Sequence, residues 1–387
     1  MSRLPGSRRD FLLAAAQTSA SALLVPGLAG CGRPSPVRAS PPHPLTPGTG
    51  GADSLQAHAT ARGFLTGCAV NVQALESDPA YAALVREQSS ILVAENEMKW
   101  ASLRPTVDTF EFERADKLVA FAEEHHIKVR GHNLCWHRQL PAWFAKEATE
   151  QNARQLLVDH INKVAGRYSG RMHSWDVVNE AVYVQDGRPD GLRLSPFMKL
   201  IGEDYLELAF HTARLADPHA LLTYNDYGIE GEDAESQAKR SAVILLLRRL
   251  KARNVPLDAV GVQSHINAGP QHRYGAGLRQ FLAEVQELGL QVFLTEMDVN
   301  DRSLPADDGV RDIEVAATYG RYLDLMLRDP NVTAVLTWGI TDKLTWLNGE
   351  DARADHLPER CLPFDAQYRP VPAFFAMRNS YDRRRQG

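Results

Sequence analysis

The chain has 387 residues, of which 44% are hydrophobic and 24% are charged. A chain of this length and composition can bury a large core in one big domain or two small ones. The formal net charge is −5 and the isoelectric point is about 6.2, so no basic surface is available for a polyanion. Nucleic acid is therefore not an expected partner, whereas a neutral substrate is compatible with this charge.

Residues 1–31 differ in composition from the rest of the chain and predict an export signal, which takes no part in the fold. The string SRRDFL (7–12) resembles a twin-arginine signal, and LAGC (28–31) resembles a bacterial lipobox. A membrane-spanning helix is disfavoured because polar residues interrupt the apolar run. We expect export to the periplasm or beyond, with Cys31 lipidated as a membrane anchor. The alternative is an ordinary signal that is cleaved nearby, with Cys31 incidental.

Residues 32–53 are rich in Pro, Ser and Gly and predict a linker. No later linker or repeat follows, so residues 54–383 are expected to form one catalytic domain, and we expect a monomer. Beyond Cys31 the chain contains only Cys68, Cys135 and Cys361. An odd number of cysteines cannot all pair within one chain, so at most one disulfide is expected.

Along residues 54–383, short apolar runs alternate with amphipathic helical patterns. The predicted strands are Phe64–Val70, Ile91–Ala94, Lys128–Leu134, Ser174–Val178, Ala220–Tyr224, Ala259–Val262, Gln291–Leu294 and Ala334–Thr337. The predicted helices are Tyr81–Gln88, Arg114–His125, Asn152–Gly166, Tyr205–Ala216, Ala234–Ala252, Gly277–Leu288, Ile313–Arg328 and Ala373–Tyr381. Alternation of this kind is typical of the α/β class, and the number of strands predicts a single (β/α)8 TIM barrel.

Polar and aromatic residues cluster directly after these strands. The clusters are 95–100, 132–139, 179–180, 225–227, 263–265, Glu296 with Asp298, and Trp338. In a TIM barrel the carboxyl ends of the strands form the catalytic face. A single polar residue at a strand end has an ordinary structural explanation, but clusters at seven strand ends indicate an active site.

Eight sequence motifs resemble glycoside hydrolase family 10, the xylanase family, over about Phe64 to Tyr381. They are ENEMKW (95–100), GHNLCWHRQLPAW (131–143), WDVVNE (175–180), IGEDYLELAF (201–210), YNDY (224–227), GVQSHI (261–266), LTEMD (294–298) and TWGITDKLTW (337–346). The chain departs from the family pattern at Asn133, at Leu347 and in the long, charged stretch 348–360. These departures concern substrate preference on the aglycone side rather than the reaction.

The resemblance implies a retaining endo-β-1,4-xylanase in which Glu180 is the acid/base and Glu296 the nucleophile. Glycosidic cleavage needs a proton for the leaving oxygen and electron density for the anomeric carbon, and two carboxyl groups supply them. In a retaining enzyme these groups are expected to lie ~5–5.5 Å apart. The family pattern further implies that His265, held by Asp298, hydrogen-bonds Glu296 and favours its ionised form.

The resemblance also implies the groups that bind xylan and xylo-oligosaccharides. They are Glu95, Asn96, Lys99, His132, Trp136 and Gln139 on the glycone side, Asn179 and Gln263 beside the acid, Trp338 and Trp346 over the sugar at the cleaved bond, and Tyr227 on the aglycone side, with His265 also in the cleft. Bulky Trp338 and Trp346 would oppose the hydroxymethyl group of glucose. Trp143 and Trp175 are expected in the core. The reaction requires no cofactor, and no metal site is predicted.

Three alternatives stand beside this interpretation. A metal hydrolase could use His132, His137 and His265, although the chain contains no His-Glu-x-x-His motif and no cysteine ligand set. A carbohydrate-binding protein on a decayed barrel is disfavoured because both carboxylates are present. A glucan- or mannan-cleaving relative would share Glu180 and Glu296.

Overall fold

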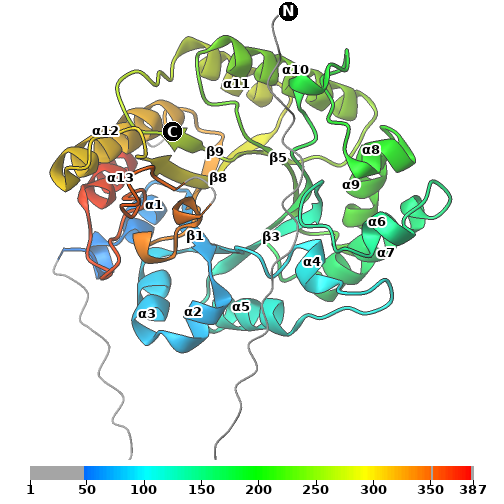
Figure 1. The fold of residues 1–387 in the computed structure, drawn as a ribbon, viewed down its shortest axis with the longest axis horizontal. Coiled ribbons are helices and arrows are strands. Elements are labelled where there is room, and N and C mark those ends of the chain that lie inside the picture. The colour runs from blue at the N-terminus through cyan, green and yellow to red at the C-terminus, as the bar shows by residue number, and fades with distance from the viewer. Residues whose placement is uncertain (1–47, 350–351, 385–387) are drawn as a thin grey trace, which may run out of the picture. The chain divides into compact units, whose positions relative to one another are not determined.

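The computed structural model describes residues 48–349 and 352–384, so the predicted export signal and Cys31 lie outside the described residues. Parallel strands form a closed barrel, seen along its axis in Figure 1. The barrel strands are β1 (Leu65–Val70), β2 (Ile91–Ala94), β3 (Lys128–Cys135), β4 (Ser174–Asn179), β5 (Leu221–Asp226), β6 (Ala259–Val262), β8 (Gln291–Asn300) and β9 (Val332–Thr337). Pairing of β1 with β9 and of β6 with β8 closes the ring. The predicted TIM barrel is confirmed.

The strand that carries Glu296 is longer than predicted. Strand β8 continues past Leu294 to Asn300, and a short additional strand, β7 (His265–Asn267), pairs with its second half. In this pairing His265 lies opposite Asp298. The extension of β8 therefore fixes two residues of the expected site, His265 and Asp298, opposite each other.

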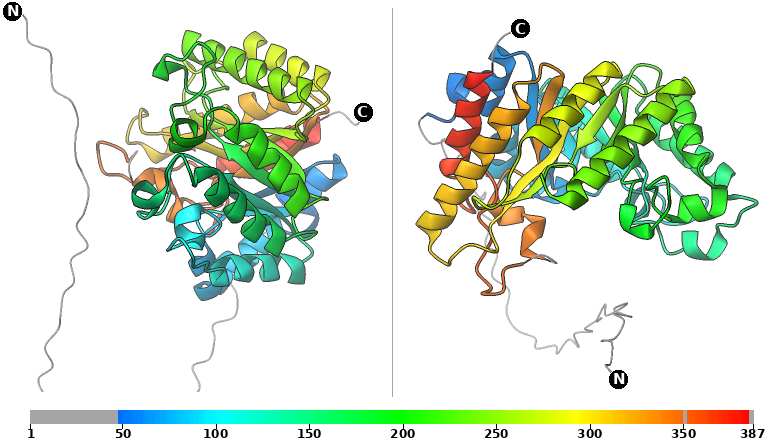
Figure 2. Two further views of the ribbon diagram at one scale, coloured as in Figure 1. Left: turned by 90° about the vertical axis from the view of Figure 1, so that its right-hand side faces the viewer. Right: turned by 90° about the horizontal axis from the view of Figure 1, so that it is seen from above.

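Helices surround the barrel, and the two views of Figure 2 show them packed along its outside. The long ones, all predicted, are α3 (Pro79–Gln88), α5 (Glu113–Glu124), α7 (Ala153–Arg167), α9 (Tyr205–Ala216), α10 (Ala234–Ala252), α11 (Ala276–Glu287), α12 (Asp308–Met326) and α13 (Pro372–Arg383). Short helices were not predicted: α1 (Leu55–Ala61), α2 (Val72–Ser77), α4 (Trp100–Leu103), α6 (Phe144–Glu147), α8 (Pro196–Ile201), and the 3-10 turns η1 (Gly51–Asp53), η2 (Val184–Asp186), η3 (Asp342–Leu344) and η4 (Trp346–Asn348). One or two turns are too short to show a helical period.

Side chains on the barrel strands alternate between two apolar layers, because successive residues of a strand point to opposite faces. On β2, Leu92 and Ala94 belong to the large core under the helices, whereas Ile91 and Val93 belong to a separate small cluster inside the barrel. Strand register places Arg130 of β3 beside Val93. A buried charge therefore lies inside the barrel, below the catalytic face.

The folded domain begins a few residues before the predicted boundary at Ser54. The backbone carbonyl of Thr49 accepts a hydrogen bond of 2.7 Å from Gln88 Nε2, and the carbonyl of Gly48 accepts one of 2.7 Å from Arg378 Nη1. Thr49 is buried. The last residues of the predicted linker are thus held against α3 and α13.

Cys68, Cys135 and Cys361 are all buried free thiols, so none of them forms the single disulfide that the sequence allowed. Trp143 and Trp175 are buried in the core, as predicted. Every helix within 48–349 and 352–384 is too short or too polar to cross a membrane.

Candidate active site

The two glutamates lie at the same end of the barrel on strands far apart in sequence. Glu180 directly follows β4, and Glu296 lies within β8. Both side chains are almost fully buried, with 8% of Glu180 and 5% of Glu296 exposed. Glu180 has φ +57°, the left-handed region that non-glycine residues rarely occupy. Such backbone geometry is frequent at functional sites, where the surrounding structure compensates for it.

A network of side-chain amides joins the two carboxylates. Asn225 Nδ2 donates to Glu296 Oε1 at 2.7 Å and to Asn179 Oδ1 at 2.9 Å. Gln263 Nε2 donates to the same Asn179 oxygen at 3.3 Å and to Glu180 Oε1 at 3.1 Å. Asn179 therefore lies at the centre, and the orientations of the two carboxylates are coupled through it.

A buried group of charges inside the barrel lies behind Glu296. Arg130 forms a bidentate ion pair with Asp176 and approaches Glu296 Oε1 to 3.6 Å. His132 Nδ1 lies 2.7 Å from the Asp176 carboxylate. Asp176 is thus paired on two sides, and the guanidinium remains as a positive charge near Glu296.

On its other side Glu296 faces a chain of three side chains. His265 Nε2 lies 3.4 Å from Glu296 Oε2, and His265 Nδ1 lies 2.9 Å from Asp298 Oδ1. The second Asp298 oxygen accepts a hydrogen bond of 2.7 Å from Trp346 Nε1. Burial alone would lower the pKa of His265, but the carboxylates of Asp298 and Glu296 raise it well above its usual value. These contacts therefore favour the protonated form of His265.

The two glutamates have opposite pKa shifts. Burial raises the pKa of Glu180, and the negative charges of Asp226 and Glu296 act in the same direction against the neighbouring donors Trp136 and Gln263. Burial would also raise the pKa of Glu296, yet nearby positive charges hold it far below its usual value. Since burial lowers the pKa of His132 and favours its neutral form, we assign that effect to His265 and Arg130. These shifts favour the protonated form of Glu180 and the ionised form of Glu296.

The structure brings most of the expected glycone-side residues together. Lys99 Nζ lies 5.2 Å from the ring centre of Trp136 and 5.5 Å from that of Trp338, and it donates to Asn96 Oδ1 at 3.1 Å. The ring of His132 packs edge-on against Trp338 at 5.3 Å. Burial lowers the pKa of Lys99, and the charges of the two glutamates and of Glu95 oppose this shift. These residues therefore lie together near the two carboxylates.

Gln139 differs from this group. Its side chain is exposed in the loop after β3, and its backbone carbonyl accepts a hydrogen bond of 2.9 Å from the backbone nitrogen of Ala101. The structure does not bring its side chain into the amide network or the ring cluster.

Tyr227 lies near Glu180. Arg193 links them, because its Nη2 donates to the Tyr227 hydroxyl at 3.0 Å and its Nε donates to the backbone carbonyl of Glu180 at 2.8 Å. A pocket of about 460 Å³ opens next to His265 and is lined by Glu230 from the loop after β5, Asn267 from β7 and Tyr274 from the loop after β7.

The geometry does not support a metal centre. In the described part of the chain, His132, Asp176 and Glu296 are the residues whose ligand atoms lie close enough together to share an ion, within 4.8 Å of one another. Arg130 contacts both carboxylates of that group. A guanidinium in this position repels a cation and supplies the charge that the carboxylates need.

Several residues of the site were not predicted. Arg130 and Asp176 lie in the middle of strands, where an apolar residue is expected, and Asn225 lay in a noted cluster without a role. A useful signal was present, since charged residues of opposite sign within two adjacent buried strands must pair inside the barrel. His137, 3.8 Å from Glu180 Oε2, was considered only as a metal ligand.

Comparison with known proteins agrees with this geometry. The model of glycosyl hydrolase family 10 matches residues 54–380. The endo-1,4-beta-xylanase B of Thermotoga neapolitana is 35% identical over 312 residues, which is 80% of this chain and 85% of that protein. A thermostable celloxylanase of Thermoclostridium stercorarium is 35% identical, over 76% of this chain and 80% of that protein. The chain also spans 26% and 46% of two longer xylanases. Among solved structures, xylanase 10B of Thermotoga petrophila in complex with xylobiose has 35% identity and a TM-score of 0.77, covering 85% of this chain and 97% of that one.

Proposed function

We infer that this chain, which belongs to glycosyl hydrolase family 10, is an endo-β-1,4-xylanase that cleaves internal bonds of xylan with retention of configuration. The observation that carries the inference is the pair of buried carboxyls with opposite pKa shifts, Glu180 raised and Glu296 lowered. The names of the related xylanases support xylan as the substrate.

In the first step a Glu296 oxygen attacks the anomeric carbon while Glu180 gives its proton to the departing glycosidic oxygen. Gln263 donates to Glu180 Oε1, so the transferred proton is assigned to Oε2. In the second step Glu180, now ionised, takes a proton from water as the water oxygen attacks the same carbon and releases Glu296. Each step inverts the carbon, and the product therefore keeps the β configuration.

Stereochemistry and chemical rescue test this mechanism. Proton NMR of the first product from xylohexaose should show the β-anomer before mutarotation, and initial α-anomer would contradict retention. Glu296→Ala should abolish hydrolysis, and azide should restore turnover of an activated xyloside by attacking from the vacated side. Glu180→Ala should still form the glycosyl-enzyme from substrates with good leaving groups, because these need little acid help.

Substrate class needs its own test, because one relative is named a celloxylanase. The buried ring of Trp338 and the half-buried ring of Trp346 support selection of xylose, which lacks the hydroxymethyl group of glucose. The rate of hydrolysis should therefore be higher on xylan than on mannan or carboxymethylcellulose. Equal rates on xylan and carboxymethylcellulose would instead indicate an enzyme that cleaves both polymers.

We also propose that the chain is exported and anchored by lipid at Cys31. The twin arginines, the lipobox-like LAGC at 28–31 and the Pro- and Ser-rich stretch after it support the proposal. Mass spectrometry of the mature protein should find a lipidated Cys31 at its N-terminus, and Cys31→Ser should release the protein from the membrane fraction. An unlipidated N-terminus elsewhere would contradict the anchor and leave export intact.

A further inference from the structure

Trp346 lies on a short turn outside the two strands that position Glu180 and Glu296. Trp346 lies in η4, and its indole nitrogen hydrogen-bonds Asp298, which in turn contacts His265 beside the nucleophile. The preceding turn, η3, starts at Asp342, whose backbone carbonyl accepts a hydrogen bond of 3.4 Å from Asn348 Nδ2. Whatever holds residues 342–348 therefore sets the position of the Trp346 ring against His265.

The segment 359–362, which runs back along this turn, holds it in place. The backbone nitrogen of Glu359 donates to Asn348 Oδ1 at 2.8 Å. The backbone nitrogens of Cys361 and Leu362 both donate to Asp342 Oδ1 at 2.9 Å. The Cys361 carbonyl accepts a bond of 2.8 Å from the hydroxyl of Tyr319 on α12. The turn is thus fixed to α12 through the returning segment.

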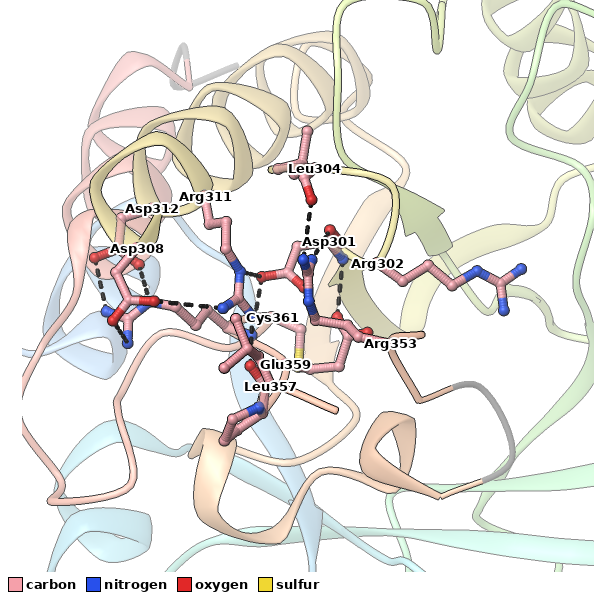
Figure 3. Close-up of polar contacts among 12 residues, drawn as sticks. Asp301, Arg302, Leu304, Asp308, Arg311, Asp312, Arg353, Leu357, Glu359 and Cys361 are labelled. Atoms are coloured by element: carbon pink, nitrogen blue, oxygen red, sulfur yellow. Dashed lines mark hydrogen bonds and ion pairs between the residues drawn. The ribbon is translucent and has the colours of Figure 1, made fainter. Parts of the chain in front are cut away.

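Figure 3 shows what fixes the returning segment itself, a group of buried polar side chains around Asp301, directly after β8. The Asp301 backbone nitrogen donates to Glu359 Oε2 at 3.0 Å, and the Asp301 carboxylate accepts from Arg311 Nε at 2.7 Å and from the Arg360 backbone at 3.2 Å. Arg353 Nη1 donates to the Asp301 carbonyl at 2.6 Å. These side chains are almost completely buried, so a lost contact cannot be replaced freely by water.

We propose that Glu359 is a positioning residue of the substrate cleft: its contact with Asp301 holds the segment 359–362 and, through it, the turn that carries Trp346. The proposal rests on the proposed function in so far as Trp346 covers the substrate. Glu359 lies in the long, charged stretch 348–360 that the sequence analysis singled out.

The charges around Glu359 make the contact sensitive to pH. Burial and the hydrogen bond to Asp301 raise the pKa of Glu359 to about 8, and burial raises the pKa of Asp342 to about 8. The other charged groups that face this site are Arg311, Asp308 and Asp312 from α12, and Arg353, Asp355 and Arg360 from the loop. The pKa values of Glu359 and Asp342 are raised only while the segment 359–362 is held in place. The free energy that holds this segment therefore decreases as pH rises toward 8 and the two carboxyls lose their protons. Above that pH, Glu359 and Asp301 repel each other.

Hydrogen exchange of the segment 342–349 tests the contact without substrate. Glu359→Ala should speed exchange there at pH 6, whereas Glu359→Gln, which keeps both a donor and an acceptor, should not. In the unaltered chain, exchange relative to the intrinsic rate should increase as pH rises toward 8 and level off above it, and Glu359→Gln should weaken that increase. Asp308→Asn, which removes a charge from the exposed edge of the same group, should leave protection unchanged.

Kinetics with xylohexaose test the consequence for the cleft. Glu359→Ala should raise KM about 3- to 10-fold, equivalent to ~0.7–1.4 kcal/mol of binding, with kcat changed less than about twofold. Equal exchange and equal KM in all variants would overturn the proposal. If Glu359→Ala does not fold, an unchanged pH dependence of exchange in Glu359→Gln would overturn it. If the chain does not cleave xylans but the exchange results hold, the proposed function fails and the positioning role of Glu359 stands.

Discussion

Asn225 donates a hydrogen bond of 2.7 Å to Glu296 from the same nitrogen that holds Asn179. Its own oxygen accepts from Thr295 Oγ1 at 2.7 Å, so the amide cannot rotate without losing several partners. Asn225 therefore fixes one oxygen of the proposed nucleophile and leaves the other toward His265.

Asn225→Ala should lower kcat/KM on xylohexaose. A hydrogen bond to a charged group contributes ~1.5–3 kcal/mol, which corresponds to a loss of about 10- to 150-fold. Steady-state kinetics measure the effect, and Asn162→Ala on the exposed face of α7 is the matched control. Activity within about twofold of the unaltered chain would show that Asn225 does not hold the nucleophile.

The barrel and its two glutamates could be predicted because both depend on local patterns. Apolar runs define the strands, and the residue after each strand must lie on the catalytic face, which is enough to bring Glu180 and Glu296 to one end. The family resemblance implied Asn179 and Gln263 beside the acid, but the two bonds of Asn225 were beyond reach, because they depend on how β5 lies relative to β4 and β8. The bond from Trp346 to Asp298 depends in addition on a loop whose conformation is set by buried ion pairs.

The pH dependence of activity should be bell-shaped. The reaction needs Glu296 ionised and Glu180 protonated, so activity falls as pH drops through the lowered pKa of Glu296 and as pH rises through the raised pKa of Glu180. Asp226→Asn removes a negative charge that raises the pKa of Glu180, and it leaves the Lys239 ammonium, 2.7 Å from Asp226, without its partner. Both effects lower the pKa of Glu180.

The alkaline limb of kcat/KM should therefore move to lower pH in Asp226→Asn, while the acid limb stays in place. Asp190→Asn, which breaks an ion pair with Arg188 in the loop after β4, is the control and should move neither limb. A shift of the alkaline limb to higher pH would mean that a group other than Glu180 sets it.

Arg130→Met should destabilise the fold strongly. Asp176 would remain buried inside the barrel without its guanidinium partner, and breaking a buried ion pair from one side costs ~3–5 kcal/mol. Arg154→Met breaks the exposed pair with Asp204 instead, where ~0–1 kcal/mol is expected. Urea denaturation gives both free energies of unfolding. Similar values for the two variants would show that Asp176 is not dependent on Arg130.

Gly261→Ala tests how closely β5 and β6 approach at the catalytic end. A Cβ at this position would lie 2.1 Å from Asn225 Oδ1 and 3.0 Å from Thr295 Cγ2, so the Asn225 amide must move. Activity should fall by about the same factor as in Asn225→Ala, and overpacking should cost ~1–3 kcal/mol of stability. Gly166→Ala on α7, where nothing lies within 4 Å of the added atom, should be neutral or stabilising by ~0.5–1 kcal/mol.

The double variant Gly261→Ala with Asn225→Ala separates displacement of the amide from general damage to the strand. Once Asn225 is truncated, the added methyl group no longer meets the amide oxygen. Adding Gly261→Ala to Asn225→Ala should then cost little further activity, so the two changes should be strongly non-additive, as expected for residues in contact. Additive losses would mean that Gly261→Ala acts on Glu296 by another route, through Thr295 and the course of β8.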